Sequence, residues 1–165
     1  MIPVIIMPGA YDPSTYFFPQ QPLNECFFPN TIQTNNCFLV TNPVECLIRG
    51  FKILGTSGEN IKSISRYSSL KHPLEIAEFF LNSNLIFPNS PENYGCFQFS
   101  GKDPFMINSL PRIFFSGGCS EFSSKIITDE AHNNSCLILN IPKFSDTVSS
   151  VAVNLNTLQC ISLKL

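Results

Sequence analysis

Short apolar runs separated by turn-forming residues predict a chain rich in β-strands. The first run covers residues 3–7 and is bounded by Pro8 and Gly9. A run of this length with several Val and Ile residues predicts a strand that is buried on both faces. Proline lacks a backbone donor and glycine admits unusual backbone angles, so the strand should end there. Because α/β sheets carry their sites at the carboxyl ends of strands, the loop over residues 8–13, with the carboxylate of Asp12, is the first candidate site.

The same pattern predicts the elements that follow. We expect a strand over residues 37–41, a hairpin of residues 44–48 and 51–54 with its turn at Arg49-Gly50, and helices that begin after the small-residue turn 55–60 and at Pro73. Residues 87–111 contain four prolines and should be irregular. A strand over residues 112–116 should end at Gly117-Gly118, and strands at 126–127, 136–141, 148–155 and 160–165 predict an antiparallel meander. The chain is thus predicted to form a single α/β domain, rich in β structure, over residues 1–165.

Aromatic residues and prolines are interspersed along residues 14–29. Three prolines exclude regular helix, so the segment should run extended across the domain. Five aromatic residues in it need a surface to pack against: Tyr16, Phe17, Phe18, Phe27 and Phe28. Two interpretations are open, a structural loop anchored by its rings or a surface that binds a partner.

The charge content argues against direct binding to a nucleic-acid backbone. Charged residues make up 13% of the chain, against roughly 25% in average proteins, and the net charge is −2. Binding to phosphates requires clustered cations, whereas Lys52, Lys62, Arg66 and Lys71 form a loose scatter that is typical of a solvated face. We therefore expect little direct nucleic-acid binding.

The seven cysteines predict a reducing compartment. No two form a C-x-x-C pair, and several lie inside apolar runs, which favours buried free thiols over disulfides. The N-terminus lacks the basic residues of a signal peptide, and no apolar run approaches the ~20 residues of a membrane helix. We expect a soluble, intracellular chain without contact to a membrane.

An ordered set of short motifs carries a family resemblance. The motifs include Met7-Pro8-Gly9 with Asp12-Pro13, residues 18–23, 40–43 and 54–60, and residues 66–69, 103–105, 124–127 and 153–155. By these motifs the chain resembles, over nearly its whole length, the second, regulatory (B-type) subunits of eukaryotic DNA polymerase delta. The resemblance implies the C-terminal part of a calcineurin-like phosphoesterase β-sandwich flanked by helices. It also implies that the upstream portion and an OB-fold domain are absent from this chain.

Active enzymes of that fold hold two metal ions with a Gly-Asn-His-Asp/Glu loop and a Gly-His-x-His loop, and the metals activate a water molecule. Here the first loop is Gly9-Ala10-Tyr11-Asp12, with Ala10 and Tyr11 in place of the Asn and His ligands. The second loop, Gly55-Thr56-Ser57-Gly58, contains no imidazole. Asp12 is expected to cap its turn, and His72 and His132 have surface or capping roles outside any ligand spacing. We therefore expect no catalytic residue, no metal and no cofactor.

Two functions are weighed on this basis. The first is a non-catalytic scaffold of polymerase delta in DNA replication and repair in the nucleus. It would hold the C-terminal metal-binding domain of the catalytic subunit and the third subunit, which connects to the sliding clamp. The five aromatic residues between 16 and 28 are its candidate anchors. The alternative is an active metal-dependent phosphodiesterase or nuclease, which draws on the fold and on Asp12.

Overall fold

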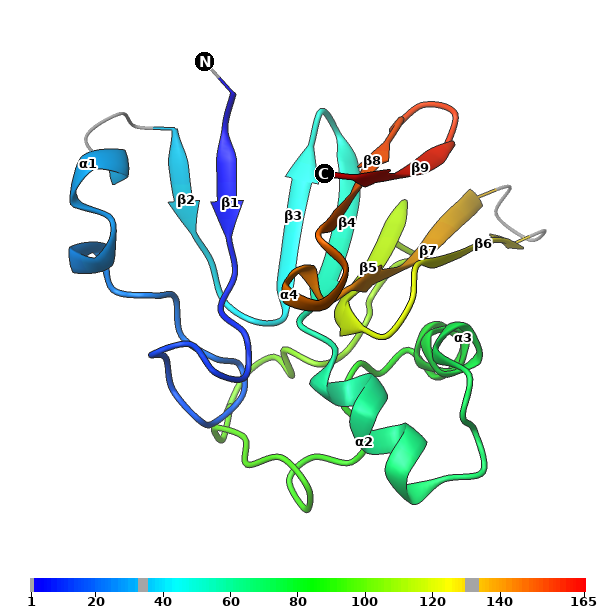
Figure 1. The fold of residues 1–165 in the computed structure, drawn as a ribbon. Coiled ribbons are helices and arrows are strands. Elements are labelled where there is room, and N and C mark those ends of the chain that lie inside the picture. Colours follow the sequence, from blue (N-terminus) through cyan, green and yellow to red (C-terminus); the bar gives the residue numbers. More distant parts are fainter. Residues whose placement is uncertain (1, 33–35, 130–133) are drawn as a thin grey trace.

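A mixed five-stranded sheet forms the centre of the molecule, in the order β3-β4-β5-β7-β6 (Figure 1). The computed structural model describes residues 2–32, 36–129 and 134–165. Strands β4, β5 and β7 run parallel, and β3 and β6 pair antiparallel with the neighbours at the two edges. Two further sheets have two strands each, the parallel pair β1-β2 and the antiparallel hairpin β8-β9. The predicted α/β class, rich in β structure, is confirmed.

The elements lie near their expected positions, and the ends of several strands differ from the predicted ones. The strands are β1 (Val4–Ile6), β2 (Cys37–Leu39), β3 (Val44–Ile48), β4 (Phe51–Thr56), β5 (Ile113–Cys119), β6 (Ser123–Asp129), β7 (Asn134–Pro142), β8 (Ser149–Val153) and β9 (Cys160–Lys164). The helices are η1 (Glu25–Phe27), α1 (Pro29–Ile32), α2 (Glu59–Tyr67), α3 (Pro73–Ser83) and α4 (Phe144–Thr147).

Side chains along β4, β5 and β7 point alternately to the two faces of the sheet, and each face carries a hydrophobic core. Leu54, Phe114 and Ile138 are register neighbours whose side chains are buried against α2 and α3. The preceding residue on each strand points to the opposite face, as the two-residue period of a strand requires. Those residues pack against the β8-β9 hairpin and its connection, in a second core of Ile53, Ile113, Leu137, Leu139 and Leu158. The result is a layer of helices, the central sheet and a second, smaller β layer.

Local signals predicted several boundaries correctly. Arg49 and Gly50 both have positive φ, which is the geometry of a tight hairpin turn between β3 and β4. Pro73 lies in the first turn of α3, and Asn84 ends that helix in the left-handed conformation. Residues 87–111 contain no helix or strand beyond isolated bridges, as their prolines predicted.

Three expectations about the strands need correction. Strand β1 is not buried on both faces, because β2 is its only partner among the described strands and Val4 and Ile5 are exposed. Strand β5 does not end at Gly117-Gly118. It continues through a β-bulge there, and Gly118 supplies a φ of +60°. The C-terminal strands are antiparallel as predicted, but they form the hairpins β6-β7 and β8-β9 in separate sheets.

The segment 14–29 also differs in one respect from its prediction. It is mostly extended, yet Glu25–Phe27 form a short 3-10 helix that Asn24 caps by accepting a hydrogen bond from the backbone of Cys26. A single helical turn with a side-chain cap fits between Pro22 and Pro29. No helix in the three described ranges is long and apolar enough to cross a membrane.

All seven cysteines are free, but only Cys119 and Cys136 are buried. Burial raises the pKa of Cys119 to about 11 and that of Cys136 to about 12. The expectation of free thiols is confirmed, whereas the expectation that they are buried is wrong for Cys26, which is exposed, and only partly met by the other four.

The buried thiols predict a loss of stability in alkaline solution. An unfolded thiol has a pKa of about 8.5, so above that pH the unfolded chain gives up protons that the folded chain keeps. The free energy of unfolding should be at its full value below this pH. It should then fall by up to about 1.4 kcal/mol per pH unit for each thiol as the pH approaches the folded pKa. Urea unfolding at rising pH measures this slope, and Cys136→Ala should make it shallower. Equal slopes for the parent and the variant would contradict the prediction.

Candidate functional site

The two loops that the sequence singled out lie side by side. A Cβ added to Gly9 would lie 3.5 Å from Oδ2 of Asp12 and 4.0 Å from the Cβ of Ser57. The backbone N–H of Gly9 donates to Oδ2 of Asp12 at 2.7 Å, so this carboxylate closes its own turn, as predicted. Ala10 and Tyr11 are exposed at the tip of that turn, and the side chain of Tyr11 is 95% exposed.

The second loop begins with the last two residues of β4, where packing leaves little room. Gly55 contacts the ring of Phe115, because an added Cβ would lie 2.0 Å from that ring. Thr56 is fully buried and its hydroxyl donates to Oδ1 of Asn60 at 3.1 Å. Gly58 is the N-cap residue of α2, with a φ of +94°, and faces the backbone of Gly117. These residues are therefore required by packing and backbone geometry.

A buried polar network joins the two loops, and the sequence did not predict it. Nδ2 of Asn42 donates to Oε1 of Gln20 at 2.7 Å and also to the hydroxyl of Ser57. Gln20 in turn donates to the carbonyl of Gly9, and Ser57 donates to the carboxylate of Glu59. Asn42 and Gln20 are 22 residues apart, so no local pattern marks the pair. Both amides are buried, and the contact gives each a hydrogen-bond partner, as buried polar groups need.

The chemistry of these side chains does not suit a pair of metal ions. Asp12 already accepts from Gly9, and Glu59 already accepts from Ser57. Among the described residues, no group of three or more His, Cys, Asp or Glu side chains could hold a metal. His72 caps α3, where its Nδ1 accepts from the backbone of Leu74 at 3.3 Å. His132 lies outside the described residues. Within the described ranges, the carboxylates of the two loops are thus engaged in hydrogen bonds with their own loops.

Asn42 provides a test of the network. We expect Asn42→Ala to lower the free energy of unfolding by about 2 kcal/mol, because Gln20 and the backbone N–H of Ser57 lose a buried partner. Asn108→Ala, at an exposed position, is the control and should change it by less than about 0.5 kcal/mol. Chemical denaturation measures both. A loss at Asn42 no larger than at Asn108 would show that the network adds no stability.

The five candidate anchor residues do not share one environment. Phe18 is 3% exposed and its ring packs against Phe87 and Tyr94, at centroid distances of 4.6 and 5.4 Å. Tyr16, Phe17 and Phe27 are exposed, and Phe28 is half-buried. The ring of Phe18 therefore anchors the segment, as the structural interpretation predicts, and the partner-binding interpretation stays a prediction for the exposed rings.

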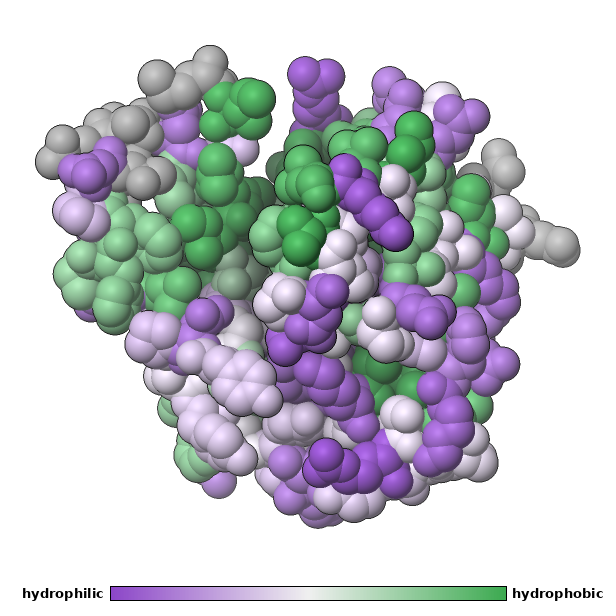
Figure 2. Space-filling model, in the orientation of Figure 1, coloured by the Kyte–Doolittle hydropathy of each residue, from purple (hydrophilic) through white to green (hydrophobic). Residues whose placement is uncertain are grey.

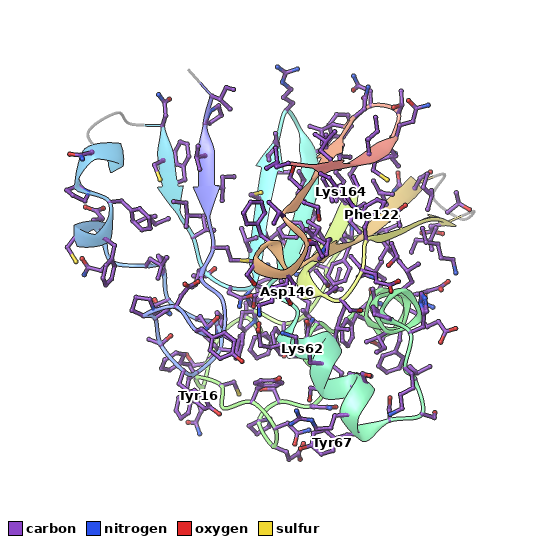
Figure 3. All side chains as sticks on the ribbon, viewed as in Figure 1. Tyr16, Lys62, Tyr67, Phe122, Asp146 and Lys164 are labelled. Carbon is purple, nitrogen blue, oxygen red and sulfur yellow. The ribbon has the colours of Figure 1, made fainter. Side chains whose placement is uncertain are left out.

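Two residues from a distant segment extend this surface. The ring of Phe17 contacts the ring of Phe97 at 5.7 Å, and Phe97 lines a shallow cavity of about 370 Å³ together with Phe99. We call Tyr16, Phe17, Phe97 and Phe99 the aromatic patch. Figure 3 shows Tyr16 at the lower left of the molecule, away from the helices α2 and α3. The alternating pattern of Phe97-Gln98-Phe99 was the sequence signal for the additional pair.

The comparisons with known proteins agree on one family. The model of the family of B subunits of DNA polymerases alpha and epsilon matches residues 1–124. The chain belongs to this family. It is 36% identical over 162 residues to "DNA polymerase delta small subunit" of Arabidopsis thaliana and 34% identical over 159 residues to "DNA polymerase delta subunit 2" of Drosophila melanogaster. A third relative, the "DNA polymerase delta small subunit" of Saccharomyces cerevisiae, is 26% identical over 194 residues.

The matches cover nearly all of the chain but a minor part of each relative. The alignments with the Arabidopsis and Drosophila proteins include 98% and 96% of this chain, and 37% of either relative. The yeast alignment includes 99% of the chain and 39% of that relative. The match to the family model ends within the sheet, after the start of β6, so the relatives extend the similarity through β7, β8 and β9.

Proposed function

We propose that the chain is part of a non-catalytic accessory subunit of DNA polymerase delta, with a scaffold role in DNA replication and repair in the nucleus. The observation that carries the proposal is the similarity to relatives named as polymerase delta small subunits along 96–99% of the chain. The engaged carboxylates of Asp12 and Glu59 support the absence of catalysis. The partners would be the C-terminal metal-binding domain of the catalytic subunit and the third subunit, which connects to the sliding clamp.

The proposal includes the organisation of the longer protein. Residues 1–165 would be the C-terminal portion of a phosphoesterase-like domain, with the OB-fold domain outside this chain. An uncovered apolar groove of about 420 Å³ between β1 and the β8-β9 hairpin supports this view. Figure 2 shows apolar side chains gathered around it. The relatives are long enough to supply a covering segment, because this chain accounts for only 37% of two of them.

Complex formation tests the scaffold role. The 165-residue chain is co-expressed with the C-terminal domain of a delta-type catalytic subunit, and the mixture is separated by size-exclusion chromatography. We expect co-elution, weakened by the double variant Tyr16→Ala/Phe17→Ala, since exposed aromatic residues often anchor interfaces. Tyr67→Ala/Phe144→Ala is the matched control, because these rings are similarly exposed outside the aromatic patch. Separate elution of two folded proteins would contradict the proposal that this segment carries the interface.

A phosphodiesterase assay tests the alternative function. With manganese and a chromogenic phosphodiester, we expect no turnover above that of buffer. The described side chains near Asp12 form no group of His, Cys, Asp or Glu residues that could hold a pair of metal ions. Asp12→Ala should leave this baseline unchanged and lower the free energy of unfolding by about 1–2 kcal/mol, through the loss of a charged acceptor for Gly9. Metal-dependent turnover that Asp12→Ala abolishes would establish the enzyme and overturn the scaffold proposal.

A further inference from the structure

Four cationic side chains from three parts of the chain line one groove. Lys62 and Arg66 belong to α2, and Lys71 lies in the connection between α2 and α3. Lys143 is the residue directly before α4. The groove has a volume of about 720 Å³. We call it the basic groove. The sequence predicted a loose scatter of Lys52, Lys62, Arg66 and Lys71. The fold instead brings the last three together and adds Lys143, while Lys52 lies outside the groove.

The basic groove is strongly positive relative to the rest of the molecule. It holds four of the ten Lys and Arg residues of a chain whose net charge is −2. One carboxylate lines it, that of Asp146, and this carboxylate lies 3.5 Å from Nζ of Lys143. Glu59, at the start of α2, is buried and its carboxylate accepts from Ser57. Among the described lining residues, four positive charges therefore face one negative charge.

The local structure sets where the charges lie. Nζ of Lys62 is 3.5 Å from the position that a Cβ on Gly118 would occupy, so this ammonium lies over the wall formed by the β5 bulge. Lys71 is held against α2 by a hydrogen bond to the carbonyl of Ser65. Lys62 and Arg66 make no ion pair with another described residue. Figure 3 labels Lys62 on α2 and Asp146 on α4, two helices that both contribute to the lining of the groove.

We propose that the basic groove binds a short acidic segment of a partner polypeptide. Carboxylates form charge-assisted hydrogen bonds with Lys and Arg, and complementary charge gives such a contact its specificity. The partly exposed ring of Pro73 also lines the groove, so it offers an apolar contact for the aliphatic part of a peptide beside the charges. This inference concerns a surface separate from the aromatic patch and does not depend on the polymerase assignment.

The lining of the groove favours a peptide over a nucleic acid. None of the described residues that line it is aromatic, so it offers no ring on which a base could stack, as single-strand sites do. Duplex binding rests on many phosphate contacts along an extended cationic surface, whereas this groove presents four cations in a compact space. Its volume falls within the ~300–1,000 Å³ range of sites for small ligands and short segments.

Fluorescence anisotropy with the 165-residue chain tests the proposal. The probe is a short fluorescein-labelled peptide of alternating glutamate and alanine, and an oligodeoxynucleotide of equal net charge is the comparison. We expect Lys62→Gln/Arg66→Gln to weaken peptide binding by at least about tenfold, because two cations that form no ion pair with a described residue are removed. Lys102→Gln/Lys164→Gln removes the same charge at exposed positions outside the groove, and should weaken binding by less than about twofold.

The outcomes of this binding experiment distinguish a peptide site from a nucleic-acid site and from general charge attraction. Binding of the peptide that depends on Lys62 and Arg66, and exceeds binding of the oligodeoxynucleotide at the same salt concentration, supports the proposal. Tighter binding of the oligodeoxynucleotide through the same residues would assign the groove to nucleic acid and overturn it. Equal losses in the groove variant and the control variant would mean general charge attraction, and would overturn it as well. Circular dichroism of both double variants establishes that they fold alike.

Discussion

Phe18→Ala is expected to lower the free energy of unfolding by about 3–5 kcal/mol, as for other buried phenylalanines. The ring of Phe18 is 3% exposed and fills the space between Phe87 and Tyr94 in the core below the sheet. Removing it opens a cavity beside Phe87 and Tyr94, while the backbone N–H of residue 18 can still donate to the carbonyl of Gly95. Urea unfolding monitored by circular dichroism measures the change.

The adjacent Phe17 provides the matched control for Phe18. Its side chain is 47% exposed and contacts Phe97 at the surface. Phe17→Ala should therefore lower the free energy of unfolding by only about 1 kcal/mol. If the two variants lost equal stability, the division of the segment into a core anchor and a surface residue would be wrong.

The second large effect is expected at Gly58, where Gly58→Ala should lower the free energy of unfolding by about 3 kcal/mol or more. Two causes combine at this position. The φ of +94° is unfavourable for any residue with a Cβ, and the new Cβ would lie 2.1 Å from the carbonyl oxygen of Gly117. Because Gly117 belongs to the bulge in β5, the substitution should separate the start of α2 from the sheet.

Two other glycines separate these causes. Gly50 has a φ of +83° with nothing within 4 Å of an added Cβ, so Gly50→Ala should cost about 1 kcal/mol from backbone strain alone. Gly101 has neither a positive φ nor a close neighbour, and Gly101→Ala should change stability by less than about 0.5 kcal/mol. A loss at Gly58 no larger than at Gly50 would mean that the contact with Gly117 relaxes freely.

The turns, helix starts and caps that were predicted correctly from the sequence depend mainly on residues close together in the chain. The turn at Arg49-Gly50 and the first turn of α3 at Pro73 are fixed by residues a few positions apart. The role of Asp12 as a cap is of the same kind, because its partner is Gly9. Such local chemistry acts through backbone angles and short-range hydrogen bonds, and it is visible in the order of residues.

What the sequence could not predict depends on which distant segments meet. The apolar run of β1 has the composition of a buried strand, but burial is decided by its single neighbour β2. The contact between Asn42 and Gln20 and the convergence of Lys143 with Lys62 arise only after the sheet forms. The five aromatic residues of segment 14–29 have a similar tendency to be buried. Only tertiary packing decides that Phe18 is buried and Phe17 is exposed.

The hydrogen bonds on both sides of the aromatic patch affect the entropic cost of binding a partner protein there. Gln20 donates to the carbonyls of Gly9 and Thr15, and Phe18 pairs with the backbone beside Phe97. Tyr16 and Phe17 therefore lie on a segment that is tied down on either side before any partner arrives. Association then requires little ordering of the backbone, so the entropic cost of binding falls mainly on side-chain rotamers and on the partner. Such a surface selects for partners that already match its shape.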